Sequence, residues 1–170
     1  EIEEVPVGAA SIAQVHRALT TDGRRVAVKV LRPGVEEDFA RAIETYEWAA
    51  AQIEPMGGEI ARLQPRLVIE TFKRWTAREL NFTREAASAS ELAETMTSEP
   101  NFFVPAVDWA RTTGKVLTIE WIDGIKLSNR KALVEGGYDL PELARVLVHA
   151  FLRQAIADGF FHADMHQGNL

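Results

Sequence analysis

Residues 162–169 read His-Ala-Asp-Met-His-Gln-Gly-Asn, and residues 26–29 read Val-Ala-Val-Lys. The first stretch is polar and places Asp164 five residues before Asn169. A carboxylate can accept a proton and an amide oxygen can bind Mg²⁺, so this stretch is the strongest candidate for chemistry. The second stretch ends a run of β-branched residues with Lys29, which is typical of a short, well-covered strand.

The spacing of both stretches is that of protein kinases. His-x-Asp-x-x-x-x-Asn is the pattern of a kinase catalytic loop, where the Asp accepts or orients the proton of the substrate hydroxyl and the Asn holds Mg²⁺. This pattern predicts a catalytic role for Asp164 and a metal-binding role for Asn169. Val-Ala-Val-Lys matches the strand-borne kinase motif whose Lys pairs with nucleotide phosphates and with a helical Glu. The two motifs lie about 135 residues apart in kinase order, which argues against coincidence.

Other interpretations of these residues stay open on the sequence alone. The octapeptide could be a surface turn in which Asp, Asn and Gly only satisfy turn geometry. His162, Asp164 and His166 could share one face of an extended segment and bind a metal, although no fourth ligand is evident. Lys29 could be an edge residue whose stem covers apolar surface.

Composition limits the class of protein. The 170 residues are 46% hydrophobic and 26% charged, which suits one domain or two small lobes. No run approaches the roughly 20 apolar residues of a membrane helix, so no transmembrane segment is expected. Lys+Arg 19 against Asp+Glu 25 gives a net charge of −6, which makes nucleic acid a poor first guess.

The absence of cysteine excludes disulfides and thiolate metal sites and fits a reducing compartment. We therefore expect a cytoplasmic location, with membrane association of the full-length protein as a further expectation. Because the chain begins at Glu1 and ends at Leu170 directly after a dense polar motif, we expect a fragment cut at both ends.

The order of predicted elements indicates an α+β fold rather than an alternating βαβ sheet. Strands are predicted before and after a turn at residues 21–24. Helices are predicted at residues 35–53 and from 65 towards 96, with a break near Asn81. A second hairpin is predicted from residues 107–109 and 116–121. A short helix capped by Ser128 and a longer helix at residues 140–158 follow.

The chain resembles the UbiB family of atypical kinases, which is linked to ubiquinone biosynthesis. The resemblance depends on Ala-Ala-Ser-Ile-Ala-Gln-Val-His at residues 9–16, Arg-Pro-Gly at 32–34, Arg-Glu-Leu-Asn-Phe-Thr-Arg-Glu-Ala-Ala at 78–87, and the two kinase motifs. It implies a two-lobe, protein kinase-like fold. Residues 1–124 would form an N-lobe with inserted helices, and residues 125–170 the first part of a helical C-lobe ending in the catalytic loop.

The resemblance also implies a nucleotide site. An alanine-rich loop would replace the Gly-rich loop of ordinary kinases, and alanine would narrow its backbone freedom and add methyl groups near the phosphates. The residues of this loop are Ala9, Ala10, Ser11, Ile12, Ala13 and Gln14. Lys29 would contact phosphate, with Glu85 as its helical ion-pair partner. Backbone groups of Glu120 and Ile122 would meet the adenine edge.

Two positions depart from the family pattern. Glu79 and Asn81 occupy the family's Glu-x-Asp motif, but Asn81 is an amide and supplies no negative charge. Taken without the family, Glu79 and Glu85 are ordinary solvated helix carboxylates. Gln167 stands where the family usually has Pro, which loosens the loop but leaves Asp164 and Asn169 in place.

The resemblance implies that ATP and Mg²⁺ are the cofactors and that a nucleotide is the first partner. The expected activity of the full-length protein is ATP hydrolysis or phosphoryl transfer linked to a lipid or quinone-precursor ligand and to biosynthetic partner proteins. The 170 residues alone are expected to be inactive. The alternatives are a small-molecule phosphotransferase of the aminoglycoside or choline kinase type, and a non-catalytic scaffold that senses nucleotide.

Overall fold

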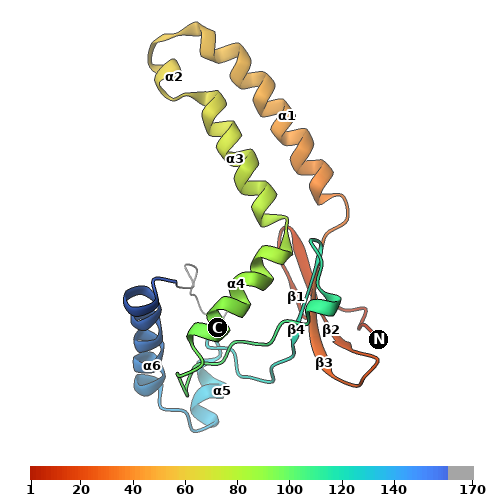
Figure 1. Cartoon of the computed structure of the whole chain (residues 1–170), viewed down its shortest axis with the longest axis vertical. Helices are drawn as coiled ribbons and strands as arrows, with labels where there is room; N and C mark the ends of the chain where they lie inside the picture. The colour runs from red at the N-terminus through yellow and green to blue at the C-terminus, as the bar shows by residue number, and fades with distance from the viewer. Residues whose placement is uncertain (161–170) are drawn as a thin grey trace. The chain divides into compact units, whose positions relative to one another are not determined.

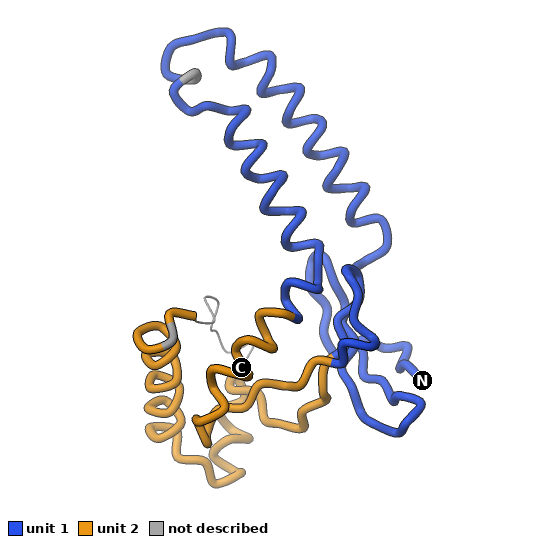
Figure 2. The backbone as a smooth tube through the Cα atoms, viewed as in Figure 1, with its two compact units in different colours: residues 1–86, 108–118 blue, residues 87–107, 119–170 orange. Residues whose placement is uncertain are grey.

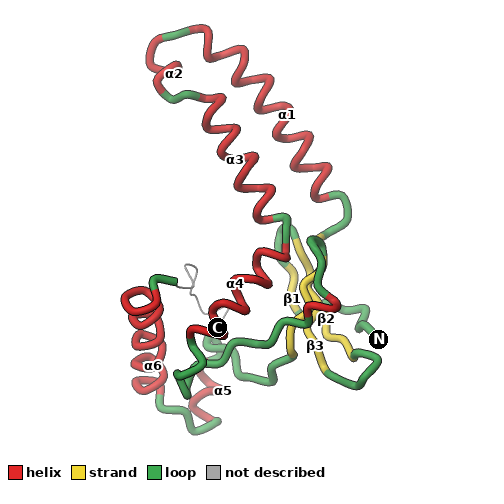
Figure 3. The backbone as a smooth tube through the Cα atoms, viewed as in Figure 1, coloured by secondary structure: helices red, strands yellow, loops and turns green. Residues whose placement is uncertain are grey.

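Helices and one four-stranded sheet, whose first three strands pair antiparallel, make up the described part of the chain, which confirms the expected α+β class (Figures 1 and 3). The structure is a computed structural model that describes residues 1–160, apart from the side chains of residues 60, 61 and 158. The strands are β1 (Gly8–Ala9), β2 (Ala13–Leu19), β3 (Arg25–Leu31) and β4 (Val116–Glu120). The α-helices are α1 (Val35–Ile53), α2 (Gly58–Arg62), α3 (Pro65–Glu79), α4 (Phe82–Thr95), α5 (Arg130–Glu135) and α6 (Leu140–Arg153).

The sheet has the strand order β1-β2-β3-β4 and contains the first predicted hairpin. β2 and β3 pair antiparallel from Ala13 opposite Leu31 to Leu19 opposite Arg25. Gly23 has a φ of 82°, a left-handed conformation that glycine adopts without the steric cost of a Cβ, and it closes the predicted turn. The alternate apolar residues of the sheet form one core cluster, which consists of Ala18, Val26 and Val28 with Val30 and Val116 packed against it.

The helix predicted at residues 35–53 matches α1 at both ends. Its first turn carries Glu36, Glu37 and Asp38, whose negative charges are favourable at a helix N-terminus. α1 packs against α3, and the two form a helical hairpin with α2 between them (Figure 1). Ile43 and Ala50 are buried, whereas Tyr46 and Trp48 are exposed. The apolar stripe of α1 is therefore only partly covered within the described chain.

The predicted break near Asn81 separates α3 from α4. The Asn81 side-chain oxygen accepts hydrogen bonds from the Thr83 backbone N–H at 3.1 Å and from Thr83 Oγ1 at 2.6 Å. The Phe82 N–H donates to the Gly114 carbonyl at 2.9 Å. The bonds from the two backbone N–H groups, Phe82 and Thr83, satisfy donors that a helix start leaves without an intrahelical partner, so the break is a capped helix terminus.

Two predicted details differ from the structure. The second hairpin has one regular strand, β4, and its other arm contributes only the bridge between Val107 and Ile119. The chain curls into a 3₁₀ turn at Trp109–Arg111 instead of remaining extended. The cap of α5 is Asn129, whose side chain accepts a hydrogen bond from the Ala132 N–H at 3.1 Å; the Ser128 prediction is wrong by one residue.

The helix predicted at residues 140–158 consists of α6 and a following wider π-helical turn at Gln154–Asp158. Asp139 caps α6, because its side chain accepts a hydrogen bond from the Glu142 N–H at 3.2 Å. Ala150 on α6 is buried with Leu92 and Met96, and this core cluster also contacts Phe102 and Val104.

The chain divides into two compact units, coloured separately in Figure 2. The first comprises residues 1–86 and 108–118, and the second comprises residues 87–107 and 119–170. α4 therefore begins in the first unit and ends in the second. This division groups residues 87–107 and 119–124 with the C-terminal segment, whereas the lobe boundary predicted from the sequence lies at residue 124.

An ion network ties the β2–β3 turn to the turn at residues 108–111 within the first unit. The Asp108 carboxylate accepts hydrogen bonds from Arg24 and Arg111, each at 2.9 Å, and its side chain is 7% exposed. Burial raises the pKa of Asp108, but the bonds from the two guanidinium groups outweigh it and hold the pKa below its usual value. Arg24 also bonds to Asp22 at 2.7 Å.

We predict that Asp108→Asn lowers the stability of the full-length protein at pH 7 because it removes a charge held by two arginines. A carboxyl whose pKa is lower in the folded state stabilises the fold above its unfolded pKa of about 3.9 and loses that contribution as the pH falls through the folded value. The stability difference between wild type and variant, measured by urea denaturation, should be constant from pH 7 to 5 and shrink only below about pH 4.

Asp38→Asn is the control, because Asp38 pairs with Arg41 on an exposed face of α1. It should change stability much less than Asp108→Asn, because an exposed ion pair and one charge near a helix N-terminus each contribute little. A difference at Asp108 that does not depend on pH would show that the charge is not what stabilises the turn.

Candidate functional site

Lys29 on β3 and Glu85 on α4 form the ion pair that the sequence predicts. The Lys29 Nζ atom lies 2.8 Å from Glu85 Oε1 and 2.7 Å from Oε2, so both carboxylate oxygens accept from one ammonium. The side chains are 30% and 48% exposed, respectively. The ammonium group is thus held in a fixed place and is still accessible to an anion.

The apolar face of α4 places Glu85 opposite the strand. Phe82 and Ala86 are 1% and 0% exposed, and Glu85 lies between them in the sequence. Residues three and four apart share one face of a helix, so burying Phe82 and Ala86 brings Glu85 to the same side. The Lys29 Nζ atom also lies 4.8 Å from the centroid of the Phe82 ring, which is a cation–π contact.

The alanine-rich loop is the tip of the β1–β2 hairpin. Ala9 pairs with Gln14, and the Ala10 N–H donates to the Ala13 carbonyl at 2.9 Å. Ala9, Ala10 and Ser11 are exposed, whereas Ala13 is 2% exposed. The methyl groups that can meet a ligand are therefore those of Ala9 and Ala10, while Ala13 packs inside the sheet.

The Glu-x-Asp position has a structural use in this chain. Glu79 is the last residue of α3 and is exposed, and Asn81 caps α4 through its side-chain oxygen. Asn and Asp are equally good N-caps, so the departure from the family pattern keeps the cap while it removes the charge. Within the first unit, the helix that carries Glu85 thus begins at Asn81.

Glu120 and Ile122, the expected adenine contacts, lie at the end of β4 and in the loop after it. The Glu120 N–H donates to the Ala106 carbonyl at 2.8 Å. A contact from Glu120 to an adenine edge would therefore have to use its carbonyl oxygen. Ile122 is exposed.

The predicted catalytic residue Asp164 and metal ligand Asn169 lie outside the described residues, as do His162, His166 and Gln167. Among the described residues, no group of three or more His, Asp or Glu side chains is placed to hold a metal ion.

Comparison with known proteins decides the family. All of residues 1–170 match the ABC1 atypical kinase-like domain. The chain belongs to the ABC1 atypical kinase-like family. The chain is 38% identical over all 170 residues to a protein of Marinobacter nauticus described as "Probable protein kinase UbiB".

A solved structure has a similar fold. It is described as the complex structure of Rv3197-erythromycin from Mycobacterium tuberculosis, and it matches with a TM-score of 0.63 and 30% identity over 99% of this chain. The ABC1-family chain spans 31% of the Marinobacter protein and 41% of the Mycobacterium chain.

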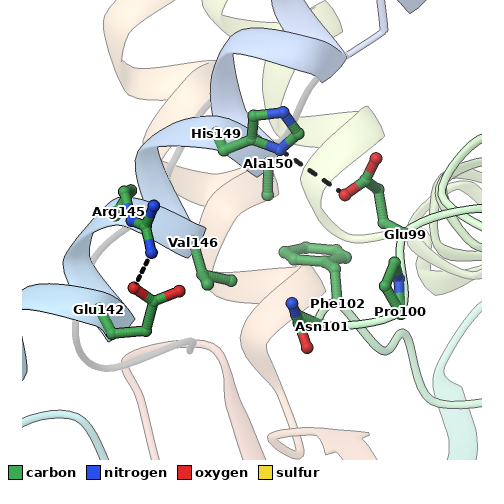
Figure 4. A pocket seen from close by; sticks show the side chains of 9 residues that line it. All are labelled: Glu99, Pro100, Asn101, Phe102, Glu142, Arg145, Val146, His149 and Ala150. Atoms are coloured by element: carbon green, nitrogen blue, oxygen red, sulfur yellow. Dashed lines mark hydrogen bonds and ion pairs between the residues drawn. The ribbon is translucent and has the colours of Figure 1, made fainter. Parts of the chain in front are cut away.

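A shallow pocket lies on the second unit of this ABC1-family chain, beside α6 (Figure 4). Its volume is about 280 Å³, and Phe102, Val146 and Ala150 supply its apolar lining. Glu99 lies 3.6 Å from His149 Nδ1, and Figure 4 shows Glu142 paired with Arg145. These residues could not be singled out from the sequence, because they come from two segments about 40 residues apart with ordinary surface composition.

Arg32 is the residue near the site that sequence reasoning overlooked. It appeared in the sequence only as part of the Arg-Pro-Gly stretch, but its Nε atom donates to the Ala10 carbonyl at 2.9 Å. A carbonyl acceptor leaves no pattern in the sequence, so this contact could not be predicted.

No helix among residues 1–160 has the length and apolar character needed to cross a membrane.

We predict that Asn81→Ala lowers the free energy of unfolding of the full-length protein by about 1 kcal/mol, the usual cost of losing a helix N-cap. Asn81→Asp should leave stability nearly unchanged, because a carboxylate accepts the same bonds from Thr83. Urea denaturation of both variants measures the difference. Equal stability of wild type and Asn81→Ala would contradict the capping role.

Proposed function

We propose that this chain binds ATP through Lys29 and the alanine-rich loop, as the nucleotide-binding part of a UbiB-type atypical kinase. The observation that carries the proposal is the bidentate Lys29–Glu85 pair, with nitrogen–oxygen distances of 2.7 and 2.8 Å. A partly exposed ammonium fixed by a helical carboxylate is what kinases place against nucleotide phosphates. Membership of the ABC1 atypical kinase-like family supports the same function.

Each residue of the proposed site has a separate role. Lys29 would hold phosphate oxygens, and Glu85 would keep the lysine in position when nucleotide is absent. Ala9 and Ala10 would present small, stiff backbone and methyl groups to the phosphates. Asp164 would accept or orient the proton of the attacking hydroxyl or water. A bound Mg²⁺, held in part by Asn169, would neutralise charge on the phosphate oxygens.

We further propose that the full-length protein acts on or regulates the handling of a lipid quinone precursor, in ubiquinone biosynthesis. This substrate class is what the resemblance to the UbiB family implies, and the Marinobacter relative is described as a "Probable protein kinase UbiB". Biosynthetic enzymes would be its protein partners. The proposal includes a cytoplasmic location, with the full-length protein associated with a membrane.

A non-catalytic nucleotide-sensing scaffold is the second candidate. It is favoured by Asn81, which serves as a neutral helix cap where the family pattern expects a negative charge. The small-molecule phosphotransferase is less well supported, because the exposed alanine-rich hairpin and the 78–87 helix region match the UbiB pattern.

Product analysis with labelled ATP separates these functions. The full-length protein is incubated with γ-labelled ATP, Mg²⁺ and a lipid extract, and the products are resolved. Free phosphate or a phosphorylated lipid supports the UbiB-type activity, whereas a phosphorylated polar small molecule supports the phosphotransferase. Tight ATP binding without turnover supports the scaffold, and the absence of ATP binding contradicts the proposal altogether.

We predict that Asp164→Asn in the full-length protein lowers turnover by about 100-fold or more and changes ATP affinity little. An amide cannot accept the proton, but it does not alter the groups that hold the phosphates. Steady-state kinetics and calorimetric ATP titration measure the two effects. Full turnover by Asp164→Asn would place the chemistry elsewhere.

We predict that Ala9→Gly raises ATP affinity about two- to fivefold, because it removes a methyl group that crowds the phosphates. Ala9 does not have a positive φ, so glycine is tolerated there without being required. Calorimetric titration measures the affinity, and thermal denaturation checks that the fold is retained. If Ala9→Gly leaves the dissociation constant of ATP unchanged, the alanine-rich loop serves packing and does not restrain nucleotide binding.

A further inference from the structure

Arg32 contacts the alanine-rich loop on both sides of Ser11. Its Nε atom donates to the Ala10 carbonyl at 2.9 Å, and its backbone N–H donates to the Ile12 carbonyl at 2.9 Å. Ser11 lies between these two acceptors and is exposed at the tip of the hairpin. One residue therefore fixes the backbone before and after the tip.

The place of Arg32 in the chain connects this loop to two other features. Arg32 directly follows β3 and lies three residues after Lys29, so it shares a rigid segment with the phosphate-binding lysine. Its carbonyl accepts a hydrogen bond from the Val35 N–H at 3.3 Å, at the start of α1. Gly34, with a φ of 77°, makes the tight turn between them possible.

The geometry limits what Arg32 can do. Its side chain is half-buried, and the Nε atom is already used by a main-chain carbonyl. A guanidinium donates to a carbonyl more strongly than a neutral group does, so this bond restrains the loop more than an ordinary turn bond would. The restraint acts on the main-chain carbonyl of residue 10. A substitution of the Ala10 side chain keeps this carbonyl and therefore keeps the acceptor.

We propose that Arg32 is a positioning residue that holds the alanine-rich loop in place for nucleotide and links it to α1, an inference that rests on the proposed function of the loop. It acts through the carbonyls of Ala10 and Ile12 and does not touch the reacting atoms. Loss of the side-chain bond frees the loop and weakens nucleotide binding.

The test compares Arg32→Met with Arg32→Lys in the full-length protein. Met keeps an aliphatic stem but has no donor, whereas Lys keeps a cationic donor. Hydrogen–deuterium exchange of the segment 8–14 without nucleotide measures the restraint, and calorimetric titration with Mg²⁺ and ATP measures affinity. Arg41→Met is the matched control, because Arg41 pairs with Asp38 on the exposed surface of α1.

We expect Arg32→Met to speed exchange in the segment 8–14 and to weaken ATP binding about fivefold, the effect of losing one hydrogen bond. Arg32→Lys should restore ATP affinity to within about threefold of wild type, because its ammonium can donate to the Ala10 carbonyl. Arg41→Met should change neither quantity. A role confined to fold stability would instead raise exchange throughout the protein.

Unchanged loop exchange in Arg32→Met, or faster exchange with unchanged ATP affinity, overturns the role of Arg32 when the wild type binds ATP. If Arg32→Met speeds amide exchange throughout the protein, the Arg32→Lys variant is the decisive one. An Arg32→Lys variant that is folded but shows fast exchange in the segment 8–14 also contradicts the role of Arg32. If the wild type binds no ATP, the proposed function fails, which is a separate result.

Discussion

The burial of one face of α4 is the constraint on which the candidate site depends. Phe82 and Ala86 are almost completely buried, and the helix start is fixed by the Asn81 cap and by the bond from the Phe82 N–H to Gly114. These contacts set the position and rotation of the helix. The Lys29–Glu85 pair is partly exposed and is worth about 1 kcal/mol or less, so it is a result of this packing rather than its cause.

An arrangement in which apolar packing positions the elements, and the ion pair contributes little to stability, suits a binding site. A helix and a strand whose positions depended on the ion pair alone would move when the ammonium also bound phosphate. Here the apolar face of α4 and the register of β3 maintain the positions of the two backbones independently of charge, and Glu85 then orients the lysine side chain. Weakening of the ion pair by a bound anion would therefore cost little folding energy.

Periodic features of this fold could be predicted from the sequence. The bounds of α1, the break at Asn81 and the β2–β3 hairpin all follow from apolar spacing, turn residues and caps, which act over a few neighbouring residues. The pairing of Lys29 with Glu85 was also predictable, but only through the resemblance to a family. Without that resemblance, Glu85 is one of many helix carboxylates.

The remaining features depend on contacts between distant segments. Arg24 and Asp108 are separated by 84 residues, and neither position carries a local pattern. The bond from Arg32 to the Ala10 carbonyl involves a main-chain acceptor that every residue possesses. The 3₁₀ turn at Trp109–Arg111 forms beside side-chain bonds between Thr112 and Thr118, which replace the regular strand pairing expected there.

The placement of the four tryptophans has a spectroscopic consequence. Trp48, Trp75 and Trp109 are exposed, so their fluorescence reports mainly on solvent. Trp121 is half-buried between Glu120 and Ile122, and its indole N–H donates to Asp123 at 2.8 Å. Replacing the three exposed indoles by phenylalanine would leave this chain with a single tryptophan, located in the segment expected to meet the adenine base.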